Sequence, residues 1–110
     1  MGEATVLIVN PNSQNGELGR QWPYLSKKIR RELAFDEVHT KGPGDATRLT
    51  RELILSGTEQ IIAIGGDGTI NEVVNGFFED GKPISENAAM GVMPYGTGGD
   101  FRKTIHIPKD

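Results

Sequence analysis

The sequence contains no cysteine, two histidines, and no apolar run longer than six residues. Without cysteine, the chain can form neither disulfides nor thiolate metal sites. His39 and His106 lack the partners and spacing of a zinc site, and we interpret both as structural or exposed residues. The short apolar runs exclude a transmembrane helix and do not resemble a signal peptide. We therefore expect a cytoplasmic protein.

Two common nucleotide-binding motifs are also absent. No Gly-Lys-Ser or Gly-Lys-Thr occurs in the chain, which excludes a Walker loop. A Rossmann dinucleotide site requires glycines at the first, third and sixth positions after the first strand. Here the first apolar run is followed by Asn10-Pro11-Asn12-Ser13 instead.

The composition is that of one ordinary domain: 110 residues, of which 35% are apolar and 25% are charged. The net charge of −3 is spread unevenly, because residues 20–51 hold eight basic and four acidic side chains. This basic stretch is either a solvated helix face or a surface attracted to an anionic membrane. A nucleic-acid partner is not expected, because aromatic residues are not interleaved with the charges.

Apolar runs predict strands at residues 4–9, 60–64 and 90–93, and residues 35–40 can form a further strand. The first is apolar throughout, which indicates burial on both faces. Amphipathic spacing predicts a helix after each of the first three strands in chain order. The apolar periodicity of the first extends over residues 17–33, the second runs from residue 45 to residue 56, and the third buries Ile70, Val73, Val74, Phe77 and Phe78.

Several boundaries follow from single residues. Pro23 is tolerated only near the start of a helix, so the first helix is expected to begin near residues 20–22. Asp45 is expected to be the N-cap of the second helix, and Gly57 its stop. Residues 79–87 are polar and are expected to form a loop.

Alternating strands and helices predict an α/β fold, a three-layer Rossmann-like parallel sheet with flanking helices. Such sheets bind ligands beyond the carboxyl ends of their strands. Four loops rich in glycine or small polar residues are expected at that edge: residues 10–16, 40–45, 65–69 and 95–100.

The most informative loop is Gly65-Gly66-Asp67-Gly68-Thr69, which joins a buried strand to a helix. Backbone N–H groups and the positive end of a helix dipole favour phosphate there. An acid beside phosphate is unfavourable unless a cation or a proton donor offsets it. The pattern therefore predicts a nucleotide-phosphate site in which Asp67 meets a metal ion or a transferable proton. A plain strand-to-helix turn explains one or two glycines, but not three around an acid.

The other loops have structural alternatives. Residues 10–13 are also compatible with a plain turn, because Asn, Pro and Ser favour turns locally. Asp45 is explained by capping alone, and residues 96–100 by a flexible tail. Asn71 and Glu72 are explained equally by the chemistry of a helix start, where the dipole favours an acid.

Taken in order, the motifs resemble the catalytic domain of the diacylglycerol kinase superfamily, which includes bacterial lipid kinases and the sphingosine and ceramide kinases. They are residues 10–13, Thr40 with residues 44–46, residues 65–76 and residues 94–101. The Gly-Gly-Asp-Gly-Thr core is shared with NAD kinases. The continuation Asn-Glu-Val-Val-Asn-Gly, at residues 71–76, is more specific to lipid kinases.

The resemblance implies transfer of the γ-phosphoryl group of ATP, with Mg²⁺, to a lipid hydroxyl of the diacylglycerol or sphingoid type. Asp67 would be the catalytic acid near the phosphates and Mg²⁺, and in some members it is the proposed base. In many bacterial members the base and the main Mg²⁺ ligands lie in a second domain. The implied ATP-binding residues are Asn10, Pro11, Asn12, Ser13, Gln14, Thr40, Gly66, Asp67, Gly68, Thr69, Ile70, Asn71, Glu72 and Thr97.

The resemblance also implies a longer protein. Residues 1–110 would be the single nucleotide-binding domain, truncated before a β-rich lipid-binding domain and inactive alone. That second domain would meet the lipid substrate at the inner face of the membrane. One residue departs from the family pattern: Gly99 stands where members usually have Asn.

Two other hypotheses remain. An NAD kinase-like enzyme would share the acid loop without the residue 71–76 continuation. A non-catalytic nucleotide-binding domain would keep the fold without the reaction.

Overall fold

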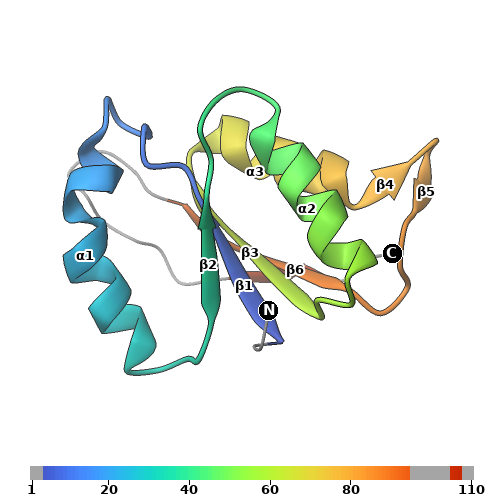
Figure 1. Ribbon diagram of the computed structural model, residues 1–110, viewed down its shortest axis with the longest axis horizontal. Coiled ribbons are helices and arrows are strands. Elements are labelled where there is room, and N and C mark those ends of the chain that lie inside the picture. Colours follow the sequence, from blue (N-terminus) through green and yellow to red (C-terminus); the bar gives the residue numbers. More distant parts are fainter. Residues whose placement is uncertain (1–3, 95–104, 108–110) are drawn as a thin grey trace.

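The computed structural model describes residues 4–94 and 105–107 (Figure 1). Within these residues, one sheet runs in the order β2-β1-β3-β6-β7. Neighbouring strands among the first four are parallel, and β7 is antiparallel to β6. The strands are β1 (Thr5–Val9), β2 (Asp36–His39), β3 (Gln60–Gly65), β6 (Ala89–Pro94) and β7 (Ile105–Ile107).

Helices cover both faces of the sheet (Figure 1), which confirms the predicted three-layer α/β fold. One face packs against α1 (Glu17–Arg30) and the other against α2 (Asp45–Leu55) and α3 (Asp67–Gly76). Alternate residues of the central strands divide between the two layers: Leu7 points to the α1 side and Val6 to the α2–α3 side. Residues 6–9 have no exposed surface, because they are covered on both faces.

The first helix starts earlier than the sequence predicts. It begins at Glu17 and contains Pro23, so the expected start near residues 20–22 is wrong. The preceding loop supplies the missing acceptors, because the N–H groups of Leu18 and Gly19 donate to the carbonyls of Ser13 and Pro11 at 3.3 and 2.9 Å. The first turn is thus satisfied by a folded loop rather than by a cap side chain.

The second helix is not capped by Asp45. Its N-cap is Gly44, and Asp45 is the first helical residue. The Asp45 carboxylate instead accepts the N–H of Lys41 at 2.7 Å, which closes the loop after β2. Gly57 follows the helix with a φ of 99°, and its N–H donates to Ile54, as expected of a stop residue.

The third helix begins at Asp67, so part of the glycine-rich loop is already helical. Asn71 and Glu72 had been expected in the first turn of this helix. They lie beyond it, because the helix begins at Asp67. Val74 is 36% exposed rather than buried, because the buried face of the helix consists of Thr69, Val73 and Gly76. A Cβ on Gly76 would lie 2.6 Å from the Thr50 Cβ, so glycine allows α2 and α3 to pack closely.

Three short strands were not predicted. Residues 79–87 are not simply a loop, because β4 (Phe78–Glu79) and β5 (Lys82–Pro83) form an antiparallel hairpin. Asp80 and Gly81 have φ values of 54° and 78°, and Asp-Gly is the preferred pair for such a two-residue turn. The antiparallel strand β7 was also missed.

Candidate functional site

The strand order locates the candidate site. From β1 the chain crosses over to β2 on one side, whereas β3 pairs with the other side of β1. An open α/β sheet binds ligands at such a switch point, beyond the carboxyl ends of its strands. The segments that follow β1, β2 and β3 all lie at this edge (Figure 1).

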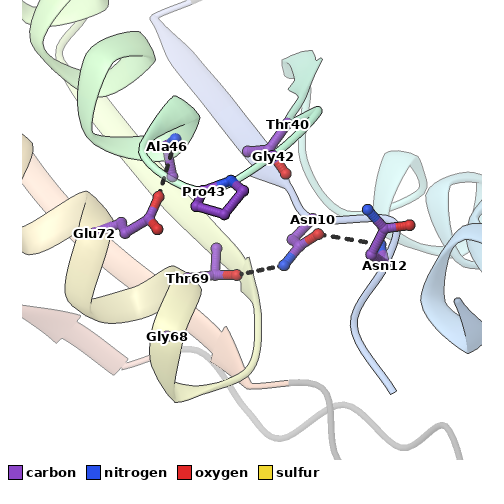
Figure 2. A pocket seen from close by; sticks show the side chains of 9 residues that line it. All are labelled: Asn10, Asn12, Thr40, Gly42, Pro43, Ala46, Gly68, Thr69 and Glu72. Carbon is purple, nitrogen blue, oxygen red and sulfur yellow. Dashed lines mark hydrogen bonds between the residues drawn. The ribbon is translucent and has the colours of Figure 1, made fainter. Parts of the chain in front are cut away.

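A pocket of about 300 Å³ opens there, on the α2–α3 side of the sheet (Figure 2). Among the described residues that line it there is no lysine or arginine, and the one charged group is the carboxylate of Glu72. The lining residues are Asn10, Asn12, Thr40, Gly42, Pro43, Ala46, Gly68, Thr69 and Glu72. The pocket therefore offers amide and hydroxyl groups rather than positive charge.

Asn10 ties together the two loops on either side of the switch point. Its backbone N–H donates to the carbonyl of Ile64 at 3.1 Å, which extends the β1–β3 ladder. Its side-chain amide donates to the Thr69 hydroxyl at 3.0 Å and accepts the N–H of Asn12 at 3.1 Å (Figure 2). The Asn10 side chain thus holds the loop after β1 against the start of α3.

Gly65 makes this close contact possible. A Cβ at this position would lie 2.9 Å from the Thr69 hydroxyl oxygen and 3.0 Å from the Ser13 hydroxyl oxygen. The Gly65 φ of 154° also favours glycine. The first glycine of the loop is therefore a packing requirement at the floor of the site.

The N-terminus of α3 is open to an anion. The first hydrogen bond of the helix runs from the N–H of Ile70 to the carbonyl of Gly66. Within the described part of the chain, the N–H groups of Asp67, Gly68 and Thr69 have no hydrogen-bond acceptor. No atom lies within 4 Å of a Cβ built on Gly68, so a ligand can approach this backbone. Free N–H groups at a helix N-terminus favour phosphate.

The N-terminus of α2 is different, because a carboxylate already occupies it. Glu72 of α3 accepts the N–H groups of Gly44 and Ala46 at 3.1 and 3.3 Å. The Thr47 hydroxyl donates to the Glu72 carbonyl at 2.8 Å. Glu72 therefore caps α2 from a neighbouring helix and adds negative charge to this side of the pocket.

The structure gathers part of the predicted set. Six of the fourteen predicted ATP-binding residues line the pocket: Asn10, Asn12, Thr40, Gly68, Thr69 and Glu72. Pro11, Ser13, Gln14, Gly66, Asp67, Ile70 and Asn71 lie in the same two segments, the loop after β1 and the start of α3, but do not line it. Thr97 and Gly99 lie outside the described residues.

Three lining residues had not been singled out as ligand contacts: Gly42, Pro43 and Ala46. The available signal was their position after β2, because that loop had been expected at the same edge. Asp67 is exposed at the first position of α3, and its side chain makes no hydrogen bond or ion pair to another described residue. Among the described residues, no three acidic, histidine or cysteine side chains gather in a way that could hold a metal ion.

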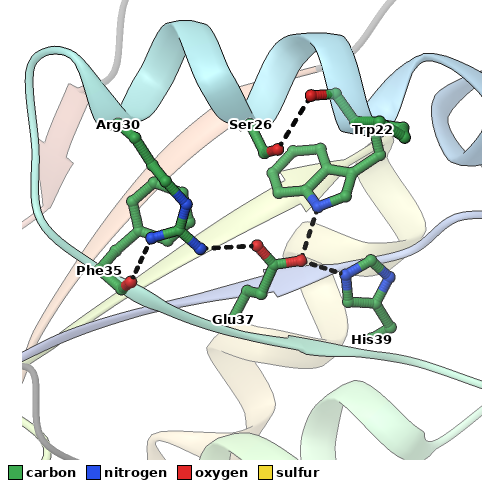
Figure 3. A network of polar contacts seen from close by, with 7 residues as sticks. Trp22, Ser26, Arg30, Phe35, Glu37 and His39 are labelled. Atoms are coloured by element: carbon green, nitrogen blue, oxygen red, sulfur yellow. Dashed lines mark hydrogen bonds and ion pairs between the residues drawn. The ribbon is translucent and has the colours of Figure 1, made fainter.

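A second polar cluster lies between α1 and β2 (Figure 3). The Glu37 carboxylate accepts the indole N–H of Trp22 at 2.7 Å and a guanidinium N–H of Arg30 at 3.1 Å. The His39 ring lies 2.6 Å from the same carboxylate. Arg30 also donates to the Phe35 carbonyl at 2.9 Å, and its guanidinium stacks 4.0 Å from the Phe35 ring centroid. The cluster anchors α1 to β2.

The contacts of Glu37 shift its acidity. Partial burial alone would raise the pKa of the Glu37 carboxyl. The hydrogen bonds from His39 and Trp22, and the charges of His39 and Arg30, outweigh that effect and lower the pKa below 4.5. The carboxylate therefore stabilises the fold above its ordinary pKa, and this contribution disappears as the pH falls through the lowered value.

The first prediction concerns Glu37→Gln, which removes the charge but keeps a side chain of similar size. We expect the variant to unfold at lower urea concentration than the parent at neutral pH, because three donors lose their charged acceptor. The difference in unfolding free energy should shrink as the pH falls from the ordinary pKa of a glutamate through the lowered value, because the parent carboxylate then also becomes protonated. Glu86→Gln, an exposed control, should show no such pH dependence. A difference that stays constant from neutral to acidic pH would contradict the role of the charge.

The second prediction concerns Asn10→Ala, which removes both side-chain hydrogen bonds at the switch point. We expect the unfolding free energy to fall by about 2 kcal/mol, because the hydroxyl of Thr69 and the N–H of Asn12 lose partners. Asn12→Ala is the matched control, since its side chain makes no hydrogen bond to another described residue. Equal urea midpoints for the two variants would show that the Asn10 amide holds nothing in place.

The helices of the described part of the chain include none that is long and apolar enough to cross a membrane. A family model described as the diacylglycerol kinase catalytic domain matches residues 4–110. The diacylglycerol kinase of Bacillus subtilis (strain 168) is 36% identical over 105 residues, which cover 94% of this chain and 33% of the relative. The diacylglycerol kinase of Staphylococcus aureus (strain bovine RF122 / ET3-1) is 37% identical, with 94% and 32% covered.

A solved structure of a diacylglycerol kinase from Bacillus anthracis str. Sterne aligns with a TM-score of 0.64 at 32% identity. That alignment covers 87% of this chain and 35% of the solved one. The chain thus spans about a third of the length of the relatives it matches. From the match over residues 4–110, the chain belongs to the diacylglycerol kinase catalytic domain family.

Proposed function

We propose that this chain is the ATP-binding domain of a lipid kinase, which transfers the γ-phosphoryl group of ATP to a lipid hydroxyl. The acceptor is diacylglycerol or a sphingoid-type lipid. Family membership supports a kinase, and the relatives are named for diacylglycerol. The observation that carries the proposal is the open N-terminus of α3 beside a pocket at the switch point.

The two parts of the site suit the two parts of a nucleotide. The pocket has uncharged hydrogen-bonding groups from Asn10, Asn12 and Thr40, and its volume is at the low end for small-molecule sites. We assign it to the nucleoside. The N–H groups of Gly68 and Thr69 would donate hydrogen bonds to phosphate oxygens, because the missing side chain of Gly68 leaves the backbone accessible. The Glu72 carboxylate makes the opposite side of the pocket unfavourable for phosphate.

We propose Asp67 as the carboxylate that helps to hold Mg²⁺. A dedicated all-protein cage is not required, because Mg²⁺ is commonly bound by one or two carboxylates together with phosphate oxygens and water. A lone exposed carboxylate at the start of α3 fits that pattern. The ion would neutralise charge on the transferred phosphoryl group. Asp67 is also our candidate for the base that accepts the proton of the lipid hydroxyl.

The remaining parts of the proposal concern the lipid. The portion of the relatives that this chain does not match is where we place the lipid-binding β-rich domain, with the lipid entering between the two parts. The reaction would then take place at the cytoplasmic surface of a membrane. On this proposal the 110-residue chain binds nucleotide but transfers no phosphate by itself.

The third prediction tests the phosphate assignment with Gly68→Asp. The added side chain enters open space, and an acid in the first turn of a helix is favourable, so the melting temperature should hold. ATP affinity measured by isothermal titration should fall by at least about a hundredfold, because two charge-assisted hydrogen bonds are opposed by a negative charge. The same titration with NAD, with and without Mg²⁺, examines the NAD kinase alternative.

Two controls separate shape from charge. Gly68→Ala adds only a methyl group to the same open space and should reduce ATP affinity much less. Asn75→Asp adds the same charge near the other end of α3 and should leave ATP affinity unchanged. If Gly68→Asp binds ATP as tightly as the parent, the phosphates do not lie at the N-terminus of α3.

The fourth prediction tests the metal role with Asp67→Asn, which keeps the size and one oxygen but removes the charge. ATP affinity without Mg²⁺ should be unchanged or higher, because a negative charge beside phosphate is lost. The gain in affinity on adding Mg²⁺ should fall by about tenfold, as expected when a metal site loses a supporting group. Asp80→Asn, in the hairpin turn, is the matched control. An unchanged Mg²⁺ effect in Asp67→Asn would exclude Asp67 from the metal site.

A further inference from the structure

The outer face of α1 carries a stripe of positive charge. Arg20, Tyr24, Lys27 and Arg31 follow one another at spacings of four, three and four residues, with Lys28 beside them. This spacing places them on one side of the helix. The opposite side packs Leu18, Trp22 and Leu25 into the core. We call these five residues the basic stripe, and it extends over about 17 Å of helix.

Most of the stripe is not neutralised by neighbouring acids. Only Arg20 has an acidic partner, Glu17, at 3.0 Å. Among the described residues, Lys27, Lys28 and Arg31 have no acidic partner within ion-pair distance. The positive charge is local, because the chain as a whole has a net charge of −3. Attraction by this face is therefore a property of α1 and not of the whole molecule.

An aromatic ring lies within the basic stripe. Tyr24 is 65% exposed, and the ammonium of Lys28 lies 5.3 Å from its ring centroid. Exposed tyrosine between lysines and arginines suits the headgroup region of a bilayer, where the ring and the methylene stems meet apolar groups and the charges meet phosphates. A single ring on a convex helix does not provide the series of stacking surfaces that unpaired bases require.

We propose that the basic stripe of α1 docks the protein on a membrane rich in anionic lipids. The choice of a membrane over other anionic partners rests on the proposed lipid kinase function, whereas the attraction itself comes from charges on this helix. The surface is separate from the nucleotide pocket, because its residues contribute nothing to the pocket lining. The helix α1 begins at the same edge of the sheet as the N-terminus of α3 (Figure 1). Docking through α1 therefore brings that edge close to the bilayer.

The fifth prediction tests the stripe with sedimentation of vesicles, without nucleotide. The chain should bind vesicles of equal parts phosphatidylcholine and phosphatidylglycerol, and not vesicles of phosphatidylcholine alone. Each cation near an anionic surface contributes about fivefold in partitioning, so the triple variant Lys27→Gln, Lys28→Gln, Arg31→Gln should bind about a hundredfold more weakly. Added salt should weaken the binding of the parent, because it screens exposed charges.

Lys82→Gln is the control for Lys27→Gln, because Lys82 is an exposed lysine on β5, at the opposite end of the molecule from α1 (Figure 1). Lys27→Gln should weaken vesicle binding and Lys82→Gln should not, with unchanged circular dichroism for both. Equal loss in the two variants, equal binding to the neutral vesicles, or binding to single-stranded DNA in place of the vesicles would overturn the proposal. ATP titration of the triple variant keeps the two hypotheses apart: intact ATP binding with lost vesicle binding supports the stripe, whatever the acceptor lipid.

Discussion

The pairing of β1 with β3 is the constraint on which the site depends. The ladder runs from Thr5 opposite Gln60 to Val9 opposite Ile64, and the apolar residues of both strands are almost completely buried. Beyond this ladder the segments that follow β1 and β3 diverge, because the first continues into α1 and the second into α3, on opposite faces of the sheet. Asn10 bridges the gap by bonding to both Ile64 and Thr69. The position of the pocket is therefore a consequence of strand order, and the Asn10 side chain links the two loops beside it.

Two helix N-termini meet at this crevice, and they differ electrostatically. At α2 the Glu72 carboxylate accepts the N–H groups of the N-cap Gly44 and of Ala46, whereas the N–H groups of Asp67, Gly68 and Thr69 in α3 have no acceptor among the described residues. A phosphate placed at α2 would have to displace a bound carboxylate. A phosphate placed at α3 would displace no hydrogen-bonded group of the described residues. The contact between the two helices thus leaves the N-terminus of α3, rather than that of α2, as the one to which we assign the phosphates.

The features that could be predicted from the sequence are those that depend on residues close together along the chain. Apolar runs identified β1, β3 and β6, and alternation of strands with helices identified the layers and the edge of the sheet where the pocket lies. Prediction failed where the partner is distant: Glu72 caps residues 26 and 28 positions away, which no local pattern reveals. The start of α1 was missed because its acceptors belong to a folded loop. The hairpin at Asp80-Gly81 was missed for a different reason. The Asp-Gly pair is a local signal for a two-residue turn, and the sequence interpretation treated these residues only as part of a loop.

The two faces of α1 depend on each other through Arg30. Trp22 and Arg30 reach inward to Glu37, and Arg30 also stacks on Phe35, so the helix has a fixed rotation against β2. Rotation is what sets the direction of every other side chain on the helix. Because Arg30 is held by its ion pair, its neighbours Lys27, Lys28 and Arg31 must point to solvent, where no acidic partner among the described residues meets them. The contacts of Trp22 and Arg30 with Glu37 thus keep the positively charged side chains on the outer face of α1 pointing in one direction.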